Sequence, residues 1–217
     1  MAYTFAVGDI HGCIDPMNRL LARIEAYAAS GTVVFLGDYV DRGPDSSAVL
    51  DRLMAGPPAA FRWICLMGNH EDMMCGAYDE RSDRDWWLDN GGIETEMSFD
   101  GRVPAVCLDW AAKLPLLHAD EHRLFVHAGV SPAFPLERQS RRDLLWLRFK
   151  SEQSEDYWGR HLVHGHTPTK SNPITVGNRT NIDGACVFGG KLVCAVFDDA
   201  IAGRPIDFIE VAAAGDA

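Results

Sequence analysis

The sequence has no long hydrophobic run and few basic residues. Nothing in its 217 residues approaches the roughly 18 consecutive apolar residues that span a bilayer, so we expect no membrane segment. The N-terminus lacks a basic stretch followed by a long apolar one, so no signal peptide is expected. Lys and Arg number 20 against 31 Asp and Glu, and the net charge is -11. Binding to a nucleic-acid polymer requires clustered cations, so this composition argues against it.

The cysteines lack the spacing of a metal or redox motif. The six residues form no C-x-x-C pair and lie mostly within apolar runs, which predicts reduced thiols in a cytoplasmic protein. Hydrophobic residues make up 47% and charged residues 24%, as in globular proteins, so disordered and fibrous classes are excluded. No repeat, low-complexity tract or linker interrupts the chain. We therefore expect one domain over residues 1–217.

Three apolar runs end in the same kind of polar motif. Residues 3–7, 32–36 and 61–67 are predicted to be strands, and they are followed by Gly-Asp, Gly-Asp and Gly-Asn. Helical spacing at 15–29 and 46–54 predicts crossovers between parallel strands. The carboxyl ends of such strands meet at one edge of the sheet, where ligands bind. Each motif alone could be a solvated polar turn, but the threefold repetition favours a functional site.

The predicted site carries oxygen and nitrogen donors and no thiolate. In extended backbone Asp9 and His11 project to the same side. Such donors suit Mn, Fe, Zn or Co. Six ligands exceed what one catalytic ion needs, so we expect two ions about 3.5 Å apart that share Asp38. The predicted metal ligands are Asp9, His11, Asp38, Asn69, His127 and His166.

The remaining segments cover this edge and complete a mixed α/β fold. Residues 72–115 are predicted to be mainly helical, with Trp86 and Trp87 packing in the core rather than forming a substrate platform. A hairpin is expected over 116–126, and the short strands over 173–211 are expected to form an antiparallel meander. Among the arginines that follow residue 140, Arg148 is the better candidate to reach phosphate.

Five blocks in the chain stand in a recognisable order. They are Gly8-Asp9-Ile10-His11-Gly12, Gly37-Asp38-Tyr39-Val40-Asp41-Arg42-Gly43, Gly68-Asn69-His70-Glu71, His127-Ala128-Gly129 and Gly165-His166. This order resembles the signature GDxHG, GDxVDRG, GNHE, HAG, GH of the phosphoprotein phosphatase family of metallophosphoesterases. A closer resemblance to small bacterial and phage lambda type serine/threonine protein phosphatases depends on Gly68–Met74, Asn90-Gly91-Gly92, Trp146–Arg148, Gly165–Pro168 and Ile182-Asp183-Gly184-Ala185.

The resemblance implies a calcineurin-like β-sandwich flanked by helices, with a dimetal site at the strand ends. Asp9 and His11 would hold the first ion, Asp38 would bridge, and the other three ligands would hold the second. A hydroxide bridging the ions would attack phosphorus, and Mn²⁺ is the first choice of metal. His70 would protonate the leaving group with Asp41 hydrogen-bonded to it, while Arg42 and Arg148 would clamp the phosphate.

Two substrates fit these motifs. The first is phosphoserine or phosphothreonine in proteins, with phosphotyrosine or small phosphate esters as further candidates. The second is a symmetrical bis(5'-nucleosyl)-tetraphosphate. Sequences of that hydrolase type usually carry an uncharged residue at the position of Asp41 and read GNHD, so Asp41 and Glu71 favour the protein phosphatase. His164 is predicted to pack beside the site and Cys13 to be an inert thiol. The oligomeric state stays open.

Overall fold

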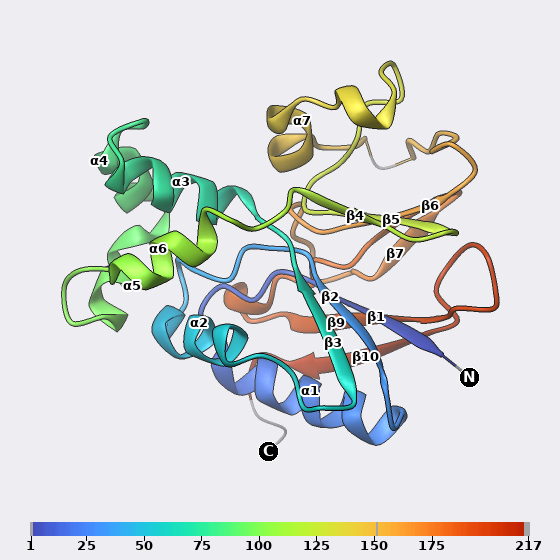
Figure 1. Cartoon of the computed structure of the whole chain (residues 1–217), viewed down its shortest axis with the longest axis horizontal. Coiled ribbons are helices and arrows are strands. Elements are labelled where there is room, and N and C mark those ends of the chain that lie inside the picture. Colours follow the sequence, from blue (N-terminus) through green and yellow to red (C-terminus); the bar gives the residue numbers. More distant parts are fainter. Residues whose placement is uncertain (1, 151, 215–217) are drawn as a thin grey trace.

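The computed structural model describes residues 2–150 and 152–214 as ten strands in two five-stranded sheets (Figure 1). In the first sheet the order is β10-β9-β1-β2-β3. Its strands are β1 (Tyr3–Val7), β2 (Gly31–Phe35), β3 (Phe61–Cys65), β9 (Lys191–Asp198) and β10 (Asp207–Ala212). The first three strands are parallel to one another, whereas β9 is antiparallel to both β1 and β10. The predicted βαβ arrangement is therefore confirmed.

The second sheet has the order β4-β5-β6-β8-β7. Its strands are β4 (Leu117–Ala119), β5 (Arg123–Val126), β6 (His161–His164), β7 (Ile174–Val176) and β8 (Arg179–Asn181). The predicted hairpin is the antiparallel pair β4–β5, but the predicted meander is wrong. The four strands form two separate antiparallel pairs, β7 with β8 in this sheet and β9 with β10 in the first sheet. Alternating apolar residues indicate a strand without specifying the strand it pairs with.

Helices cover the outer faces of both sheets. In Figure 1, α1 (Ile14–Tyr27) and α2 (Ser46–Ala55) run beneath the first sheet, and α7 (Arg141–Trp146) lies above the second. Helices α3 (Asn69–Tyr78), α4 (Arg84–Trp87), α5 (Ile93–Ser98) and α6 (Ala105–Ala111) gather at one end, with a π-helical turn at Leu88–Gly92. Two 3₁₀ turns occupy Leu136–Arg138 and Cys186–Phe188. Helix α2 begins where the Asp45 side chain accepts the Ala48 N–H at 2.9 Å.

The core lies between the sheets and beneath the helices. Within β2 and just beyond it, Val33 and Phe35 pack toward α1 and α2, whereas Val34 and Leu36 pack toward the second sheet. The same period of two separates the two faces of β1 and β9. Phe125 of the second sheet belongs to the inter-sheet cluster. The fold is therefore the expected β-sandwich flanked by helices, and burial of both faces explains the continuous apolar runs.

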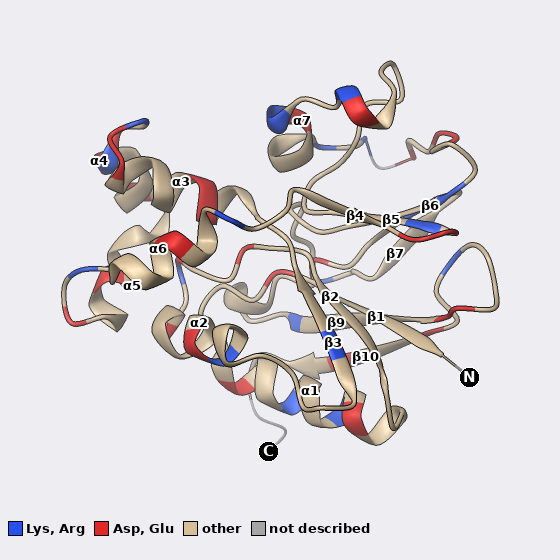
Figure 2. Ribbon diagram, in the orientation of Figure 1, with Lys and Arg blue, Asp and Glu red and all other residues tan. Residues whose placement is uncertain are grey.

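Two further findings bear on the composition. Among the described residues, no helix is both long and apolar enough to cross a membrane. Basic and acidic segments alternate over the ribbon, with many of the acidic ones on the helices (Figure 2).

Candidate active site

The strand ends of both sheets deliver the predicted metal ligands to one place. Asp9 and His11 follow β1, Asp38 follows β2, Asn69 begins α3 after β3, His127 follows β5 and His166 follows β6. The backbone is left-handed at His11 (φ 46°), Asp38 (φ 55°) and His166 (φ 63°), a conformation that non-glycine residues rarely adopt. Such outliers are typical of functional sites, because the surrounding structure has to hold them in place.

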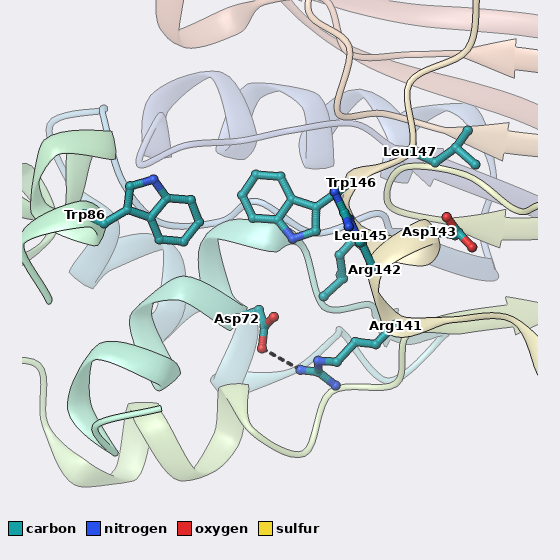
Figure 3. Close-up of a pocket in the computed structure, with 8 residues that line it drawn as sticks. All are labelled: Asp72, Trp86, Arg141, Arg142, Asp143, Leu145, Trp146 and Leu147. Atoms are coloured by element: carbon teal, nitrogen blue, oxygen red, sulfur yellow. Dashed lines mark hydrogen bonds and ion pairs between the residues drawn. The ribbon is translucent and has the colours of Figure 1, made fainter. Parts of the chain in front are cut away.

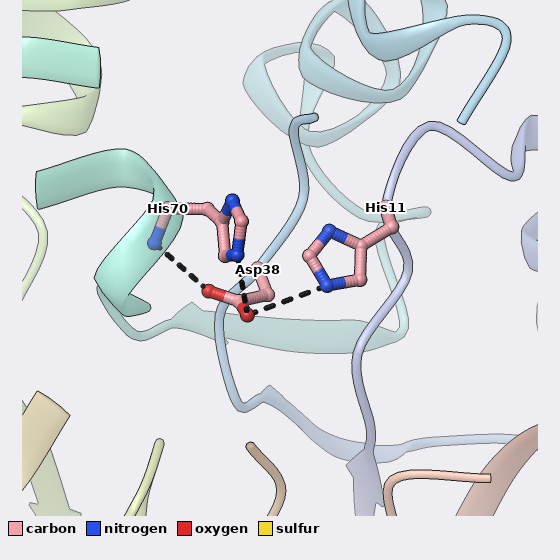
Figure 4. A group of neighbouring side chains, drawn as sticks. All are labelled: His11, Asp38 and His70. Carbon is pink, nitrogen blue, oxygen red and sulfur yellow. Dashed lines mark hydrogen bonds and ion pairs between the residues drawn. The ribbon is translucent and has the colours of Figure 1, made fainter. Parts of the chain in front are cut away.

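Asp38 lies at the centre of the site and is 2% exposed. Its Oδ2 is 3.4 Å from Nε2 of His11 and 3.9 Å from Nε2 of His70. Figure 4 shows both rings turned toward this carboxylate. Its Oδ1 is 3.4 Å from Nε2 of His127. Burial alone would raise the pKa of this carboxyl, but the imidazoles, His127 foremost, outweigh it and keep the pKa below its ordinary value.

The histidine rings present lone pairs to this carboxylate. Nδ1 of His11 lies 2.8 Å from the carbonyl oxygen of Val40, and Nδ1 of His127 lies 3.0 Å from that of Leu36. A carbonyl only accepts hydrogen bonds, so in each neutral ring the proton sits on Nδ1 and Nε2 carries a lone pair. Burial is the main cause that lowers the pKa of both rings, that of His11 to about 3.

Acceptor atoms therefore face one another in the buried site. Nε2 of His127 is 2.8 Å from Oδ1 of Asn69, so two acceptors meet there. Nδ1 of His166 can donate to the same oxygen at 2.9 Å, which leaves a lone pair on its buried Nε2, an atom without a hydrogen-bond partner among the described residues. Converging lone pairs repel unless a cation lies among them. Two sets of three donors lie within 4.8 Å of one another, namely His11, Asp38 and His70, and Asp38, His127 and His166. The side chains thus fit two metal ions that share Asp38.

Asp9 belongs to neither of these sets, although it lines the same cavity. Its carboxylate accepts the backbone N–H of His166 at 3.1 Å. His70, in contrast, belongs to a set although the sequence predicted it as an acid and not as a ligand.

His70 and Asp41 form a buried pair beside Asp38. Nδ1 of His70 lies 2.7 Å from Oδ2 of Asp41, and the two residues are 1% and 0% exposed. Oγ1 of Thr95 and Nε1 of Trp87 donate to the same carboxylate at 2.7 and 3.0 Å. Burial would lower the pKa of His70, but the charges of Asp38 and Asp41 and the bond to Asp41 outweigh it and raise the pKa. The imidazolium is thereby stabilised.

Sequence reasoning missed two of these supporting residues. Trp87 is buried, as predicted, but it also fixes the orientation of Asp41. The need of a buried indole N–H for an acceptor was the available signal. No local pattern marks Thr95, which is 54 positions from Asp41 in the sequence.

Glu71 has a structural role that the sequence did not reveal. Its buried carboxylate accepts the backbone N–H groups of Gly68 and Asp38 at 2.9 Å, Tyr39 at 2.8 Å and Val40 at 3.2 Å. Burial, and then the charge of Asp38, raises the pKa of Glu71 to about 7. The Glu71 side chain thus holds the loop at residues 38–40, in which Asp38 adopts the left-handed conformation.

Arg42 and Arg148 both line the site cavity, which has a volume of about 190 Å³. Nη1 of Arg42 is 3.0 Å from Nε2 of His11, and its backbone N–H donates to the carbonyl of Gly91 at 3.1 Å. A Cβ at Gly91, where φ is 108°, would lie 2.6 Å from the nitrogen of Arg42. The Asn90-Gly91-Gly92 segment therefore positions this arginine, and only glycine permits the approach. Arg141 lies apart and pairs with Asp72 at 2.8 Å.

A larger cavity of about 720 Å³ adjoins the site and is called the groove below (Figure 3). It is lined by Asp72, Trp86, Arg141, Arg142, Asp143, Leu145, Trp146 and Leu147. The rings of Trp86 and Trp146 stack with centroids 5.7 Å apart, and Trp146 lines both cavities. Trp86 is 45% exposed, so the prediction that it packs in the core is wrong. Helix α4 is only four residues long and turns one tryptophan inward and the other outward.

His164 and Cys13 lie beside the site. Nδ1 of His164 is 3.0 Å from the carbonyl oxygen of Gly165, and the ring packs 5.0 Å from that of Phe149. The Sγ of Cys13 donates to the carbonyl of His11 at 3.5 Å. All six cysteines are free thiols.

The family profile of the calcineurin-like phosphoesterases matches residues 4–200. The chain belongs to this family. Among curated proteins, this phosphoesterase is 35% identical over 133 residues to a symmetrical bis(5'-nucleosyl)-tetraphosphatase from Janthinobacterium, covering 59% of this chain and 44% of the relative. It is 29% identical over 205 residues to serine/threonine-protein phosphatase 1 from Salmonella typhimurium, covering 89% and 91%.

Solved structures agree on the fold. A protein named as a candidate diadenosine tetraphosphatase superimposes with a TM-score of 0.67 and 24% identity, over 97% of this phosphoesterase and 93% of that chain. The chain spans less than half the length of the tetraphosphatase from Janthinobacterium. The family relationship confirms the resemblance seen in the sequence motifs and implies divalent metal ions.

Proposed function

We propose that this phosphoesterase removes phosphate from phosphoserine and phosphothreonine in proteins, with phosphotyrosine as a further substrate. The observation that carries the proposal is the buried pair of His70 and Asp41, 2.7 Å apart. A serine alkoxide is a poor leaving group and requires a proton, whereas a nucleoside diphosphate leaves as a stable anion. A charged acid, supported by a carboxylate that is itself held by Trp87 and Thr95, therefore favours alkyl phosphate esters.

The roles of the side chains follow from their positions. When bound, two divalent ions would activate a water molecule and withdraw charge from the phosphoryl oxygens. These ions would be held by the six predicted ligands, Asp9, His11, Asp38, Asn69, His127 and His166. Arg42 and Arg148 would bind the phosphate oxygens and stabilise the charge that develops on them. His70 would donate its Nε2 proton to the leaving oxygen, while Asp41 holds Nδ1.

Two observations support a protein substrate: the extent of the alignment with a protein phosphatase, and the groove beside the site. The alignment with the Salmonella phosphatase covers 91% of that protein. The site cavity of about 190 Å³ has room for the reacting group alone, so the rest of a substrate must lie outside it. The groove shares Trp146 with the site and could receive the residues that flank a phosphoserine.

We also propose that Mn²⁺ is the native metal, that the enzyme is cytoplasmic and that residues 1–217 form a single catalytic domain. The oxygen and nitrogen donors without thiolate support the metal. The six free thiols support a reducing compartment. The inter-sheet cluster, which joins residues from Ala6 to Phe197, supports one domain.

The second candidate function is symmetrical hydrolysis of bis(5'-nucleosyl)-tetraphosphates. It is favoured by the identity of 35% with a tetraphosphatase over 133 residues. The stacked Trp86 and Trp146 could also receive a nucleobase.

The deciding experiment compares turnover of a phosphoserine peptide and of diadenosine tetraphosphate by one preparation with Mn²⁺. We expect the larger kcat/KM on the peptide. A larger value on diadenosine tetraphosphate would replace the first function with the second. Failure to hydrolyse either substrate or p-nitrophenyl phosphate, by protein whose metal content has been verified, would contradict both.

A further inference from the structure

Asp183 is a carboxylate of the site cavity that the mechanism above does not use. It follows β8, is 4% exposed and lines the cavity together with Asp9 and Asp38. Its position is fixed by several hydrogen bonds. Its Oδ1 accepts the N–H of Ala185 at 3.1 Å, and its own N–H donates to the side chain of Asn181 at 3.1 Å. Its side chain therefore has little freedom to leave the cavity.

The hydrogen bonds around the backbone of Asp183 reinforce this placement. Its carbonyl oxygen accepts from Nδ2 of the buried Asn172 at 2.6 Å and from the N–H of Thr169 at 3.3 Å. A backbone held at its N–H and its C=O sets the direction in which the side chain leaves.

Arg42 and Arg148 line the same cavity as Asp183, but neither forms an ion pair with it among the described residues. Within the described residues, neither Asp9 nor Asp183 has a Lys, Arg or His side chain within the 4.0 Å of an ion pair. The second oxygen of Asp183 has no hydrogen-bond partner within that same part of the chain. Asp9, Asp38 and Asp183 all line the same small cavity of about 190 Å³. Buried carboxylates gathered in one small cavity are costly unless cations compensate their charge.

His11, the histidine of the first metal site, lines the same cavity. Its Nδ1 is engaged by the carbonyl of Val40, so its Nε2 carries the lone pair, which faces Nη1 of Arg42 at 3.0 Å. The imidazole of His11 and three carboxylates, those of Asp9, Asp38 and Asp183, thus line one cavity. Each of these side chains is more than nine-tenths buried.

We propose that Asp183 is a positioning residue of the first metal site, where its carboxylate adds negative charge beside Asp9 and strengthens binding of the ion. This inference rests on the proposed dimetal site. With Asp183 the first site would present three carboxylates and one imidazole, a set that favours a hard ion such as Mn²⁺ over softer ones.

The test is Mn²⁺ binding to metal-free Asp183→Asn, measured by isothermal titration and by metal analysis after dialysis. The asparagine oxygen can still accept the Ala185 N–H, so only the charge is removed. We expect one of the two sites to bind Mn²⁺ about 10- to 100-fold more weakly, as for other residues that support metal ligands. Activity lost at low Mn²⁺ should return at high Mn²⁺. Asp51→Asn, on the exposed face of α2, is the matched control and should bind as the wild type does.

The outcomes separate this inference from the proposed function. If the wild type binds no pair of Mn²⁺ ions, the dimetal site itself is wrong. If the wild type binds two ions and Asp183→Asn binds both with the same affinity, the inference about Asp183 is wrong. Should Asp183→Asn fail to fold, Asp183→Ser offers a hydroxyl to the Ala185 N–H, and unchanged Mn²⁺ affinity in that variant would equally overturn the inference.

Discussion

Replacing Asp41 with asparagine should separate substrates by the quality of their leaving group. The carboxylate of Asp41 receives hydrogen bonds from His70, Thr95 and Trp87, and it is fully buried. An asparagine side chain keeps the shape but has one accepting oxygen and no charge. The imidazolium of His70 then loses its nearest counterion. The change therefore acts on the proton of the proposed acid and leaves the metal ligands in place.

The size of the effect follows from the bond that is lost. A hydrogen bond to a charged group in a buried position contributes about 1.5–3 kcal/mol, which is roughly one to two pKa units. The pKa of His70 lies above its ordinary value of 6.5, partly through Asp41. His70 is thus protonated at low pH, and it loses this proton as the pH rises through its raised pKa. In Asp41→Asn this loss should move to lower pH by roughly one to two units.

The assay is kcat against pH, with a phosphoserine peptide and with p-nitrophenyl phosphate. For the peptide, we expect the alkaline limb of Asp41→Asn to move to lower pH and kcat at pH 7 to fall by about 10- to 100-fold. Nitrophenolate leaves without a proton, so hydrolysis of p-nitrophenyl phosphate should change little. His70→Asn is the control. It should also lose activity on the peptide and keep it on p-nitrophenyl phosphate, and its pH profile should have no alkaline limb. An equal loss on both substrates with an unshifted profile would mean that Asp41 serves only to hold the fold.

Three further predictions concern the metal site, the groove and the acid stability. Asp38→Asn should lower metal content and turnover together, and intact occupancy by metal analysis would exclude the bridging role of Asp38. Trp86→Ala should lower kcat/KM by about 2- to 10-fold for peptides with an aromatic residue beside phosphoserine, from a ring contact of about 0.5–1.5 kcal/mol, and should leave glycine-flanked peptides unaffected. Burial lowers the pKa of His164 to about 3, so the folded protein leaves it neutral where the unfolded chain protonates it. Stability of the metal-free protein should fall from pH 6.5 toward 3, and in urea unfolding His164→Gln should flatten this slope by up to about 1.4 kcal/mol per pH unit.

Much of the fold could be predicted because each strand is visible in the sequence as an apolar run. The three parallel strands read as apolar runs since both of their faces are buried, and Gly at their ends marked where the chain leaves the sheet. The partners of the later strands could not be predicted. Strand β9 has alternating apolar faces that would suit a neighbour in either sheet. Its place beside β1 depends on contacts between residues almost 200 positions apart, such as Thr4 with Phe197.

The residues that surround the predicted ligands were harder to find, for a physical reason. The ligands follow strand ends, so the topology of the sheets brings them together whatever the intervening helices do. The supporting side chains come from helices and turns whose docking is set by packing. Thr95 and Trp87 reach Asp41 from α5 and α4, and a sequence motif does not specify how those helices lie.

The contrast between Glu71 and Asp183 shows how far a motif alone can be interpreted. Both are buried carboxylates within recognised motifs and both lie near Asp38. Glu71 is surrounded by four backbone N–H groups, so its charge is compensated by the loop that it holds. Asp183 accepts a single N–H and has an oxygen left over in the cavity. The sequence marks both only as acidic residues within a motif. Only the count of donors around each carboxylate separates one that holds the backbone from one whose charge is left for an ion.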